Sequence, residues 1–226
     1  MTVPGTPKSS SNGNVSADPR KTIVARGYDR IAERYLKWGG GAKVRGHYLE
    51  QVFTLMPAGG RVLDLGCGAG IPVSRRLAEK AAVVGVDISA GQIALARQNV
   101  PEAHFIHADM MAIEFPHASF DGIGAFFSLT HLPREEHAEM LRRIANWLRP
   151  GGVFVASMGA SPSQDAVEQN WLGAPMFFSH FDAATNMKLV RQADLEPFHE
   201  TVVEHEEDGN AVRFLWVMAK KVNPRT

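Results

Sequence analysis

The stretch that most constrains the fold is RVLDLGCGAG, residues 61–70. The short β-rich run Arg61–Leu65 predicts a strand, and three glycines follow it at every second position. Glycine adopts backbone conformations that are closed to other residues, so this spacing predicts a sharp turn into a helix over Pro72–Lys80. A strand, a glycine turn and a helix in this order open a βαβ unit, which favours an α/β fold.

The stretches that follow continue this alternation. Further strands are predicted over Ala82–Val86, Ala103–His107, Phe120–Phe127 and Val153–Ser157, and further helices over 90–99, Pro133–Arg149 and Asp182–Ala193. Two last strands, Glu196–Glu206 and Ala211–Lys220, flank Asp208-Gly209, a strong hairpin-turn signal. We therefore expect an α/β, doubly wound sheet of about seven strands, mostly parallel with a C-terminal antiparallel hairpin.

Two segments precede the first strand. Residues 1–20, dominated by Ser, Asn, Gly and Pro, have little to bury and are expected to form a disordered tail. Apolar residues at near-helical spacing predict helices over Thr22–Trp38 and Ala42–Met56, which would form an N-terminal helical cap over 21–57. The predicted apolar stripe of the second helix is Val44, Tyr48, Val52 and Leu55. Residues 21–222 are expected to form a single domain.

Charge and cysteine content narrow the possible functions. Lys+Arg and Asp+Glu both number 24, and a binder of phosphate backbones usually shows a basic excess, so no nucleic-acid partner is expected. The single cysteine, Cys67, excludes an intrachain disulfide and a multi-cysteine metal site, and no metal site is expected. No apolar run reaches the roughly 18 residues of a membrane span and no secretory signal is evident, so we expect a cytoplasmic protein without a membrane partner.

Acidic residues stand at the carboxyl ends of three successive predicted strands, where ligands bind in α/β sheets. Asp64, just before the glycine turn, would repel a pyrophosphate and favours a cationic or amine-bearing ligand. Asp87 ends the next strand, where a carboxylate can accept hydrogen bonds from both hydroxyls of a ribose. Asp109 could accept a hydrogen bond from an adenine amino group, and Met110 could pack on that ring. Three such acids in succession are harder to explain by chance than one.

With these motifs, the chain resembles class I S-adenosylmethionine-dependent methyltransferases that act on small molecules, over about Tyr28–Lys220. DLGCGAG resembles the first motif of that family and VVGVDIS the second, while HADM, FDGI and LRPGGVFVASM resemble later ones. The resemblance implies a Rossmann-like fold, methyl transfer by in-line displacement and S-adenosylmethionine as the cofactor. It implies these cofactor-binding residues: Tyr28, Tyr35, Asp64, Gly66, Gly68, Gly70, Asp87, Ile88, Asp109, Met110 and Phe126.

Two histidines and one aromatic segment are candidates for the acceptor side. His131 follows the fourth strand, in a loop that faces the methyl group in the resembled family, so it is a candidate catalytic base or orienting residue; the alternative is a structural hydrogen bond. Residues 159–181 form either a substrate-covering insertion or a small separate core, and His180 within them is a second candidate base. We expect a small, partly apolar or aromatic organic acceptor, and a monomer or homodimer.

Other functions stay open at this point. An NAD(P)-dependent oxidoreductase has a related sheet, although its turn is usually G-x-G-x-x-G. A non-catalytic protein could bind S-adenosylmethionine without transferring its methyl group. A nucleic-acid methyltransferase is disfavoured by the neutral charge and the lack of an Asn-Pro-Pro-Tyr-type motif, and a three-cysteine arsenic methyltransferase is excluded by the cysteine count.

Overall fold

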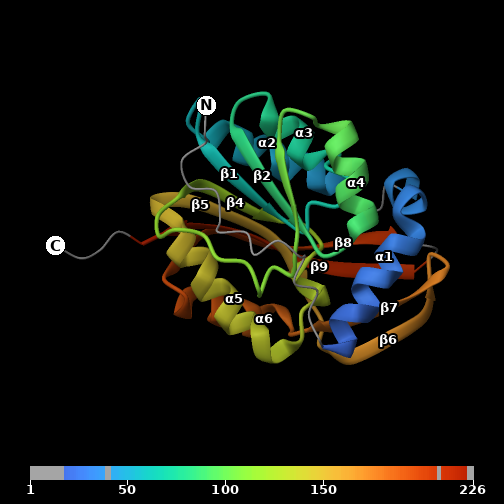
Figure 1. The fold of residues 1–226 in the computed structure, drawn as a ribbon. Coiled ribbons are helices and arrows are strands. Elements are labelled where there is room, and N and C mark those ends of the chain that lie inside the picture. The colour runs from blue at the N-terminus through green and yellow to red at the C-terminus, as the bar shows by residue number, and fades with distance from the viewer. Residues whose placement is uncertain (1–17, 39–41, 208–209, 223–226) are drawn as a thin grey trace.

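A seven-stranded sheet forms the centre of the computed structural model, which describes residues 18–38, 42–207 and 210–222 (Figure 1). The strand order is β3-β2-β1-β4-β5-β9-β8, with bounds β1 Arg61–Leu65, β2 Ala82–Asp87, β3 His104–His107, β4 Phe120–Ala125, β5 Leu148–Gly159, β8 Leu195–Glu207 and β9 Asn210–Lys221. The first five strands pair in parallel, whereas β9 runs antiparallel to both β5 and β8. The predicted sheet is therefore confirmed, while the predicted turn Asp208-Gly209 lies outside the described residues.

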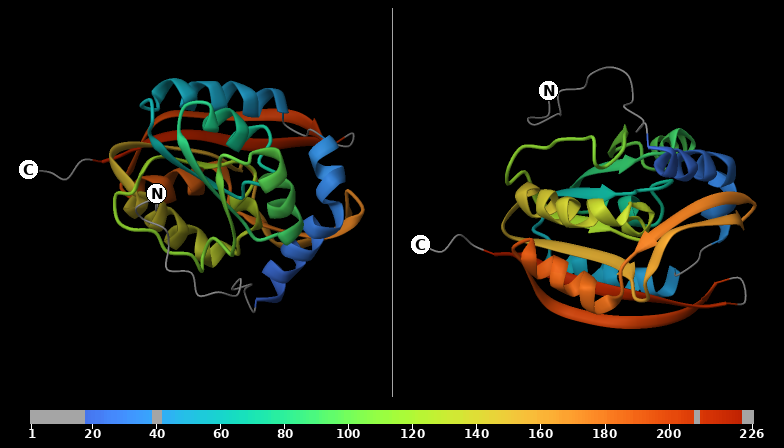
Figure 2. Two further views of the ribbon diagram at one scale, coloured as in Figure 1. Left: turned by 45° about the horizontal axis from the view of Figure 1, so that its top comes forward. Right: turned by 90° about the horizontal axis from the view of Figure 1, so that it is seen from below.

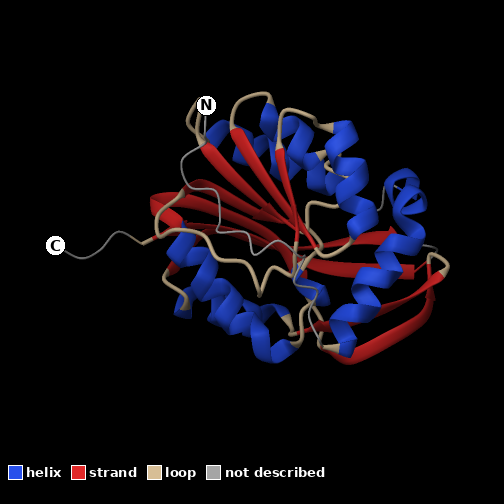
Figure 3. Cartoon of the chain, viewed as in Figure 1, coloured by secondary structure: helices blue, strands red, loops and turns tan. Residues whose placement is uncertain are grey.

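Helices cover both faces of this sheet (Figure 3). One face carries α2 (Ala42–Leu55), α3 (Val73–Ala78) and α4 (Ala90–Asn99), and the other carries α5 (Arg134–Trp147) and α6 (Ala183–Gln192). Because both faces are covered, the inner strands are mostly apolar, and Val62, Leu63 and Leu65 of β1 are buried. Within the described residues, no helix is both long and apolar enough to span a bilayer.

α1 (Pro19–Trp38) and a separate antiparallel hairpin, β6 (Ser163–Trp171) and β7 (Ala174–His180), lie together beside the main sheet (Figure 2). Most of the aromatic stretch 159–181 thus forms strands, which the sequence analysis did not assign. The turn between them has positive φ at both residues, Leu172 (49°) and Gly173 (94°), and Leu-Gly is not a common hairpin-turn pair. Helix and hairpin approach closely at Gly27, where a Cβ atom would lie 2.6 Å from the Pro175 carbonyl oxygen.

The boundary between α5 and β5 differs from the prediction. The helix expected to reach Arg149 ends at Trp147, and β5 already begins at Leu148. Leu148 pairs with Phe120 of β4 and is fully buried, so Pro150 and the two glycines after it lie inside the strand rather than between helix and strand. Pairing with a neighbouring strand decided this boundary, and local residue preference did not.

Two details of the N-terminal helices also differ. In α2 the predicted stripe residue Leu55 is 44 % exposed, whereas Leu49 is buried, because Leu49 faces the sheet together with Tyr48 and Val52. α1 begins at Pro19, two residues before the predicted boundary between tail and cap. The side chain of Asp18 accepts a hydrogen bond from the backbone N–H of Arg20, which satisfies one free donor of the first turn. Residues 1–17, most of the predicted tail, lie outside the described part.

The direction of the chain reverses around β1. From β1 the chain crosses to β2 on one side, and later returns to β4 on the other side of β1. At such a switch point the two crossover connections diverge, which leaves a crevice outside the carboxyl ends of the strands. The glycine turn after β1 and the loop after β4 therefore meet at this crevice.

Candidate active site

The glycine turn brings the ends of β1, β2 and β4 into contact. Gly66 has φ +73°, and a Cβ atom there would lie 2.3 Å from the Cβ of Ser128, in the loop after β4. The carboxylate of Asp87 accepts hydrogen bonds from the backbone N–H groups of Gly68 (2.8 Å) and Ser89 (2.9 Å). Burial raises the pKa of Asp87 to about 6, and these two hydrogen bonds oppose the rise. Asp87 thus holds both the turn and the start of α4.

A cavity of about 620 Å³ opens above this turn. Its lining includes nine residues predicted to bind the cofactor and one predicted catalytic residue: Tyr28, Tyr35, Gly66, Gly68, Asp87, Ile88, Asp109, Met110, Phe126 and His131. Carboxylates line it at the ends of β2 and just beyond β3, with apolar side chains between them. This is the combination that a flat heterocycle joined to a hydroxylated ring requires.

A second cavity, of about 550 Å³, shares Gly66 and Gly68 with the first and contains Asp64 and Arg45. Burial raises the pKa of Asp64 to about 7, although the Ser74 hydroxyl donates a hydrogen bond to its carboxylate at 2.6 Å. The Nε atom of Arg45 is buried without a hydrogen-bond partner among the described residues. A carboxyl group and a guanidinium on one cavity wall suit a zwitterionic amino acid group.

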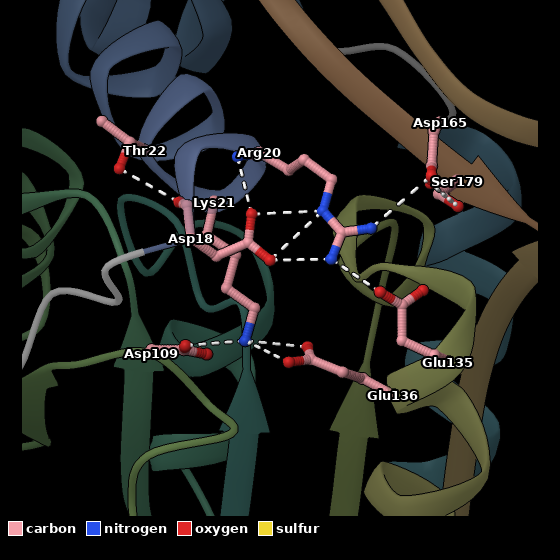
Figure 4. Close-up of polar contacts among 9 residues, drawn as sticks. All are labelled: Asp18, Arg20, Lys21, Thr22, Asp109, Glu135, Glu136, Asp165 and Ser179. Atoms are coloured by element: carbon pink, nitrogen blue, oxygen red, sulfur yellow. Dashed lines mark hydrogen bonds and ion pairs between the residues drawn. The ribbon is translucent and has the colours of Figure 1, made fainter.

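Asp109 is held by a buried lysine, as Figure 4 shows. Lys21 Nζ lies 2.8 Å from Asp109 Oδ2 and 2.7 Å from Glu136 Oε2, and its side chain is only 4 % exposed. The other oxygen of Asp109 accepts a hydrogen bond from the backbone N–H of Met111. The carboxylate of Asp109 is therefore held in place by two groups of the protein itself, the Lys21 ammonium and the Met111 N–H.

A second ion-pair group in Figure 4 ties the start of α1 to its neighbours. Arg20 pairs with Asp18 at 2.8 Å, with Glu135 of α5 at 2.6 Å and with Asp165 of β6 at 3.5 Å. Together with Lys21, Arg20 joins the helical cap to α5 and to the β6–β7 hairpin. The first turn of α1 thus closes one end of the first cavity.

The hydrogen bonds of His131 define its tautomer. Its Nδ1 lies 2.7 Å from the carbonyl oxygen of Phe177, which can only accept, so Nδ1 carries the proton. Its Nε2 is then the acceptor, and the Tyr28 hydroxyl donates to it at 2.9 Å. Burial lowers the pKa of His131 to about 4, so the imidazole is neutral at pH 7. The one acceptor lone pair of His131 therefore binds the Tyr28 hydroxyl, at the wall of the first cavity that both residues line.

A third cavity, of about 340 Å³, lies on the far side of Tyr28 and Tyr35. It is lined by Tyr28, Tyr35, Trp38, Phe127, Thr130, His131, Trp171, Phe178, Glu207 and Phe214. We call this third cavity the aromatic box. It shares Tyr28, Tyr35, Phe127 and His131 with the first cavity. A ligand in the aromatic box would therefore lie next to a ligand in the first cavity.

Two predicted site residues do not line these three cavities. Gly70 packs against the core, where a Cβ atom would lie 3.2 Å from the side chains of Phe105 and Val100. His180 packs against Gly159 at the end of β5. Cys67 lines the second cavity, and burial raises the pKa of its thiol well above the ordinary value, as suits a small packed residue.

Lys21 and Arg45 are the charged site residues that sequence reasoning missed. Lys21 stands three residues before Val24 and seven before Tyr28, so it shares the buried face of α1. A lysine in register with an apolar stripe is the signal that would have singled it out. Arg45 offers no such signal, because only the packing of α2 beside the glycine turn brings it to the second cavity.

Comparisons with known proteins agree with this geometry. Residues 62–152 match a family model described as a methyltransferase domain. The chain is 32 % identical over 157 residues to 27-O-demethylrifamycin SV methyltransferase of Amycolatopsis mediterranei, an alignment that covers 59 % of this chain and 57 % of that protein. The chain spans less than two thirds of the length of the first curated relatives it matches.

Solved structures show the same fold. Burkholderia thailandensis 1,6-didemethyltoxoflavin-N1-methyltransferase, with bound 1,6-didemethyltoxoflavin and S-adenosylhomocysteine, matches with a TM-score of 0.60 and 20 % identity, over 97 % of this chain and 95 % of that one. The 4+2 cyclase SpnF matches with a TM-score of 0.71 and 18 % identity, over 92 % and 97 % of the two chains.

Proposed function

Because this chain contains a class I S-adenosylmethionine-dependent methyltransferase domain, with S-adenosylmethionine as its cofactor, we propose that it methylates a small, partly apolar or aromatic organic acceptor. The observation that supports this most directly is the pair of joined cavities around the glycine turn. The first cavity carries Asp87 at the end of β2 and Asp109 just beyond β3. The second carries Asp64 with the unpartnered Nε of Arg45.

The residues present fit the cofactor group by group. We propose that Asp87 holds the ribose and that Asp109, Ile88 and Met110 hold the adenine. Asp64 and Arg45 would hold the ammonium and carboxylate of the amino acid tail, whose opposite charges they match. Gly66 and Gly68 leave room for the ligand between them, and Tyr28, Tyr35 and Phe126 would cover it.

When bound, S-adenosylmethionine supplies an electrophilic methyl group on a sulfonium. The task of this chain is to align an acceptor with that group and to exclude water. Tyr28 and His131 stand where the first cavity meets the aromatic box, so we propose that this is where the acceptor reacts. On binding, the acceptor O–H or N–H would replace the Tyr28 hydroxyl as the donor to the His131 lone pair, and His131 would then orient the nucleophile. His180 is left out of this proposal, because its ring lies against Gly159.

Replacing Asp87 by alanine is expected to weaken binding of S-adenosylhomocysteine at least tenfold. The lost ribose hydrogen bonds contribute about 1.5–3 kcal/mol, since they involve a charged acceptor. Titration calorimetry checks this, and Asp87→Asn, which keeps one acceptor oxygen, should lose less. Equal affinity of wild type and Asp87→Ala would contradict the proposed site, as would binding of NAD or NADP in place of S-adenosylhomocysteine in a thermal-shift screen.

Cofactor affinity is expected to rise with pH between about 5.5 and 7.5. Asp64, whose pKa is raised to about 7, is largely protonated at the lower end, and a bound ammonium group favours its ionised form. Binding of S-adenosylhomocysteine should therefore release a proton in this range, which calorimetry in buffers of different ionisation enthalpy detects. Asp64→Asn should remove the part of this dependence centred near pH 7. A dependence unchanged in Asp64→Asn would show that another group titrates.

The fold match to a 4+2 cyclase supports one alternative. On that reading the chain binds S-adenosylmethionine but catalyses a reaction without methyl transfer. Incubation with S-adenosylmethionine carrying a labelled methyl group distinguishes the two. Label that appears in an acceptor supports methyl transfer, whereas acceptor conversion without label supports the alternative.

A further inference from the structure

Lys21 lines the first cavity beside Asp109. Its ammonium donates hydrogen bonds to Asp109 Oδ2 and to Glu136 Oε1, each at 2.8 Å. The second oxygen of Glu136 lies 2.7 Å from Nζ, yet it has no hydrogen-bond partner among the described residues. An ammonium carries three N–H donors. One N–H of Lys21 is therefore left without an acceptor in the described part of the chain.

This third N–H is shut off from bulk water, because the Lys21 side chain is only 4 % exposed. A buried donor without an acceptor costs free energy, and the cost is larger on a charged group. Figure 4 shows the ammonium held between two carboxylates, Asp109 from the loop after β3 and Glu136 from α5. The side chain is fixed in this position, so a ligand in the cavity that brings an acceptor atom would satisfy the donor.

Asp109 offers the opposite kind of group at the same place. Its Oδ2 accepts from Lys21 and its Oδ1 accepts from the backbone N–H of Met111. A carboxylate only accepts, and its two oxygens have room for about four hydrogen bonds, so acceptor positions remain for a ligand. The cavity wall thus carries a donor and an acceptor side by side, with Nζ and Oδ2 2.8 Å apart.

We propose that Lys21 donates its third N–H to a ring nitrogen of the adenine, N1 or N7, while Asp109 accepts from the 6-amino group. This inference rests on the proposed function and assigns a specificity-determining residue for its cofactor. In adenine a ring nitrogen acceptor stands on each side of the amino donor, which matches the donor and acceptor on the wall. In a 6-oxopurine a carbonyl oxygen replaces the amino group and N1 carries a proton, so the match is lost.

The proposal is tested first with analogues of S-adenosylhomocysteine that change only the base. The 1-deaza and 7-deaza analogues each replace one ring nitrogen by C–H, and the inosine analogue replaces the amino group by a carbonyl. In titration calorimetry with the wild-type protein, at least one deaza analogue should bind about tenfold more weakly than S-adenosylhomocysteine, because the ammonium loses a charge-assisted hydrogen bond. The inosine analogue should lose at least about a hundredfold. Undiminished binding of both deaza analogues would overturn the proposal.

A variant then shows which donor contacts the ring nitrogen. In Lys21→Met the weaker deaza analogue should bind as tightly as S-adenosylhomocysteine, because the donor is gone. Both ligands bind the same folded protein, so the ratio of their affinities does not depend on the stability of the variant. Arg26→Met, at an exposed position of the same helix, should keep the wild-type ratio. A wild-type ratio in Lys21→Met would mean that another donor contacts the nitrogen, and the assignment to Lys21 would be wrong.

A measurement on the wild-type protein covers the case in which Lys21→Met does not fold. The nitrogen-15 NMR signal of Lys21 Nζ is identified by its absence in Lys21→Arg, which keeps a cation at this position. We expect the signal to shift on binding of S-adenosylhomocysteine and to shift less with the weaker deaza analogue. An equal shift with both ligands would contradict the proposed hydrogen bond.

Binding of S-adenosylhomocysteine itself separates this inference from the function on which it rests. If S-adenosylhomocysteine binds and both deaza analogues bind equally well, the role of Lys21 is refuted while the proposed function stands. If S-adenosylhomocysteine does not bind, the proposed function fails first, and the role of Lys21 fails with it.

Discussion

Replacing Lys21 by methionine is expected to lower the free energy of unfolding by about 3–5 kcal/mol. Methionine has a similar length but no charge, so the variant leaves the Asp109 carboxylate, whose side chain is 5 % exposed, without its cation. Glu136 loses the same partner, at 25 % exposure. An unpaired buried charge costs more than the ion pair itself contributes, and that cost dominates the expected loss. Urea unfolding followed by circular dichroism measures it.

Two further variants show whether the buried charge is the cause. Arg26→Met removes a cation from an exposed position of the same helix and should change stability by no more than about 0.5 kcal/mol. Lys21→Met combined with Asp109→Asn removes both charges and should recover a large part of the loss. A loss below 1 kcal/mol in Lys21→Met, or no recovery in the double variant, would mean that the pair is not buried in solution as the structure has it.

Replacing His131 by alanine is expected to lower turnover by about a hundredfold or more while cofactor affinity stays nearly unchanged. The variant removes the lone pair that Phe177 and Tyr28 hold in position, and orientation or proton transfer of this kind contributes at least that factor. Steady-state kinetics with the identified acceptor, together with calorimetry for S-adenosylhomocysteine, separates the two effects. Normal turnover would leave His131 with a structural hydrogen bond only.

The pH profile gives an independent check on His131. Because burial lowers the pKa of His131 to about 4, its protonation should not reduce turnover between pH 8 and pH 6. His117→Ala, at an exposed position, serves as the matched control and should retain wild-type turnover. A fall in turnover that follows a group with a pKa near 6.5, absent in His131→Ala, would show that His131 titrates as an ordinary exposed histidine.

The sequence alone predicted those residues of the candidate site that lie at or near the ends of strands. Asp64, Asp87 and Asp109 each follow or end a short apolar run, and the parallel pairing of those runs brings the three acids to one edge. Local spacing determines such positions, because a strand of known direction fixes where its last side chain lies. For the same reason the cofactor could be inferred before the acceptor.

The sequence did not predict the strands that lie next to the proposed acceptor site. The hairpin β6–β7 is stabilised against α1 by close contact at Gly27 and by apolar packing around Met176 and Phe177, contacts between segments about 150 residues apart. Neither strand has a clear alternation, and its turn pair Leu172–Gly173 is uncommon. Strand formation here follows from the partner it packs on, which no local pattern contains.

The sequence by itself determined the parallel sheet, the glycine turn and the order of carboxylates along its edge, because alternation, glycine spacing and strand direction are local properties. Only the tertiary structure decided that Lys21 neutralises Asp109, that Arg45 reaches the second cavity, and that Glu207 stands among aromatic rings from several distant segments. These are encounters between residues far apart in the chain. Their energies depend on burial and on the geometry of the partner, which exist only once the chain has folded.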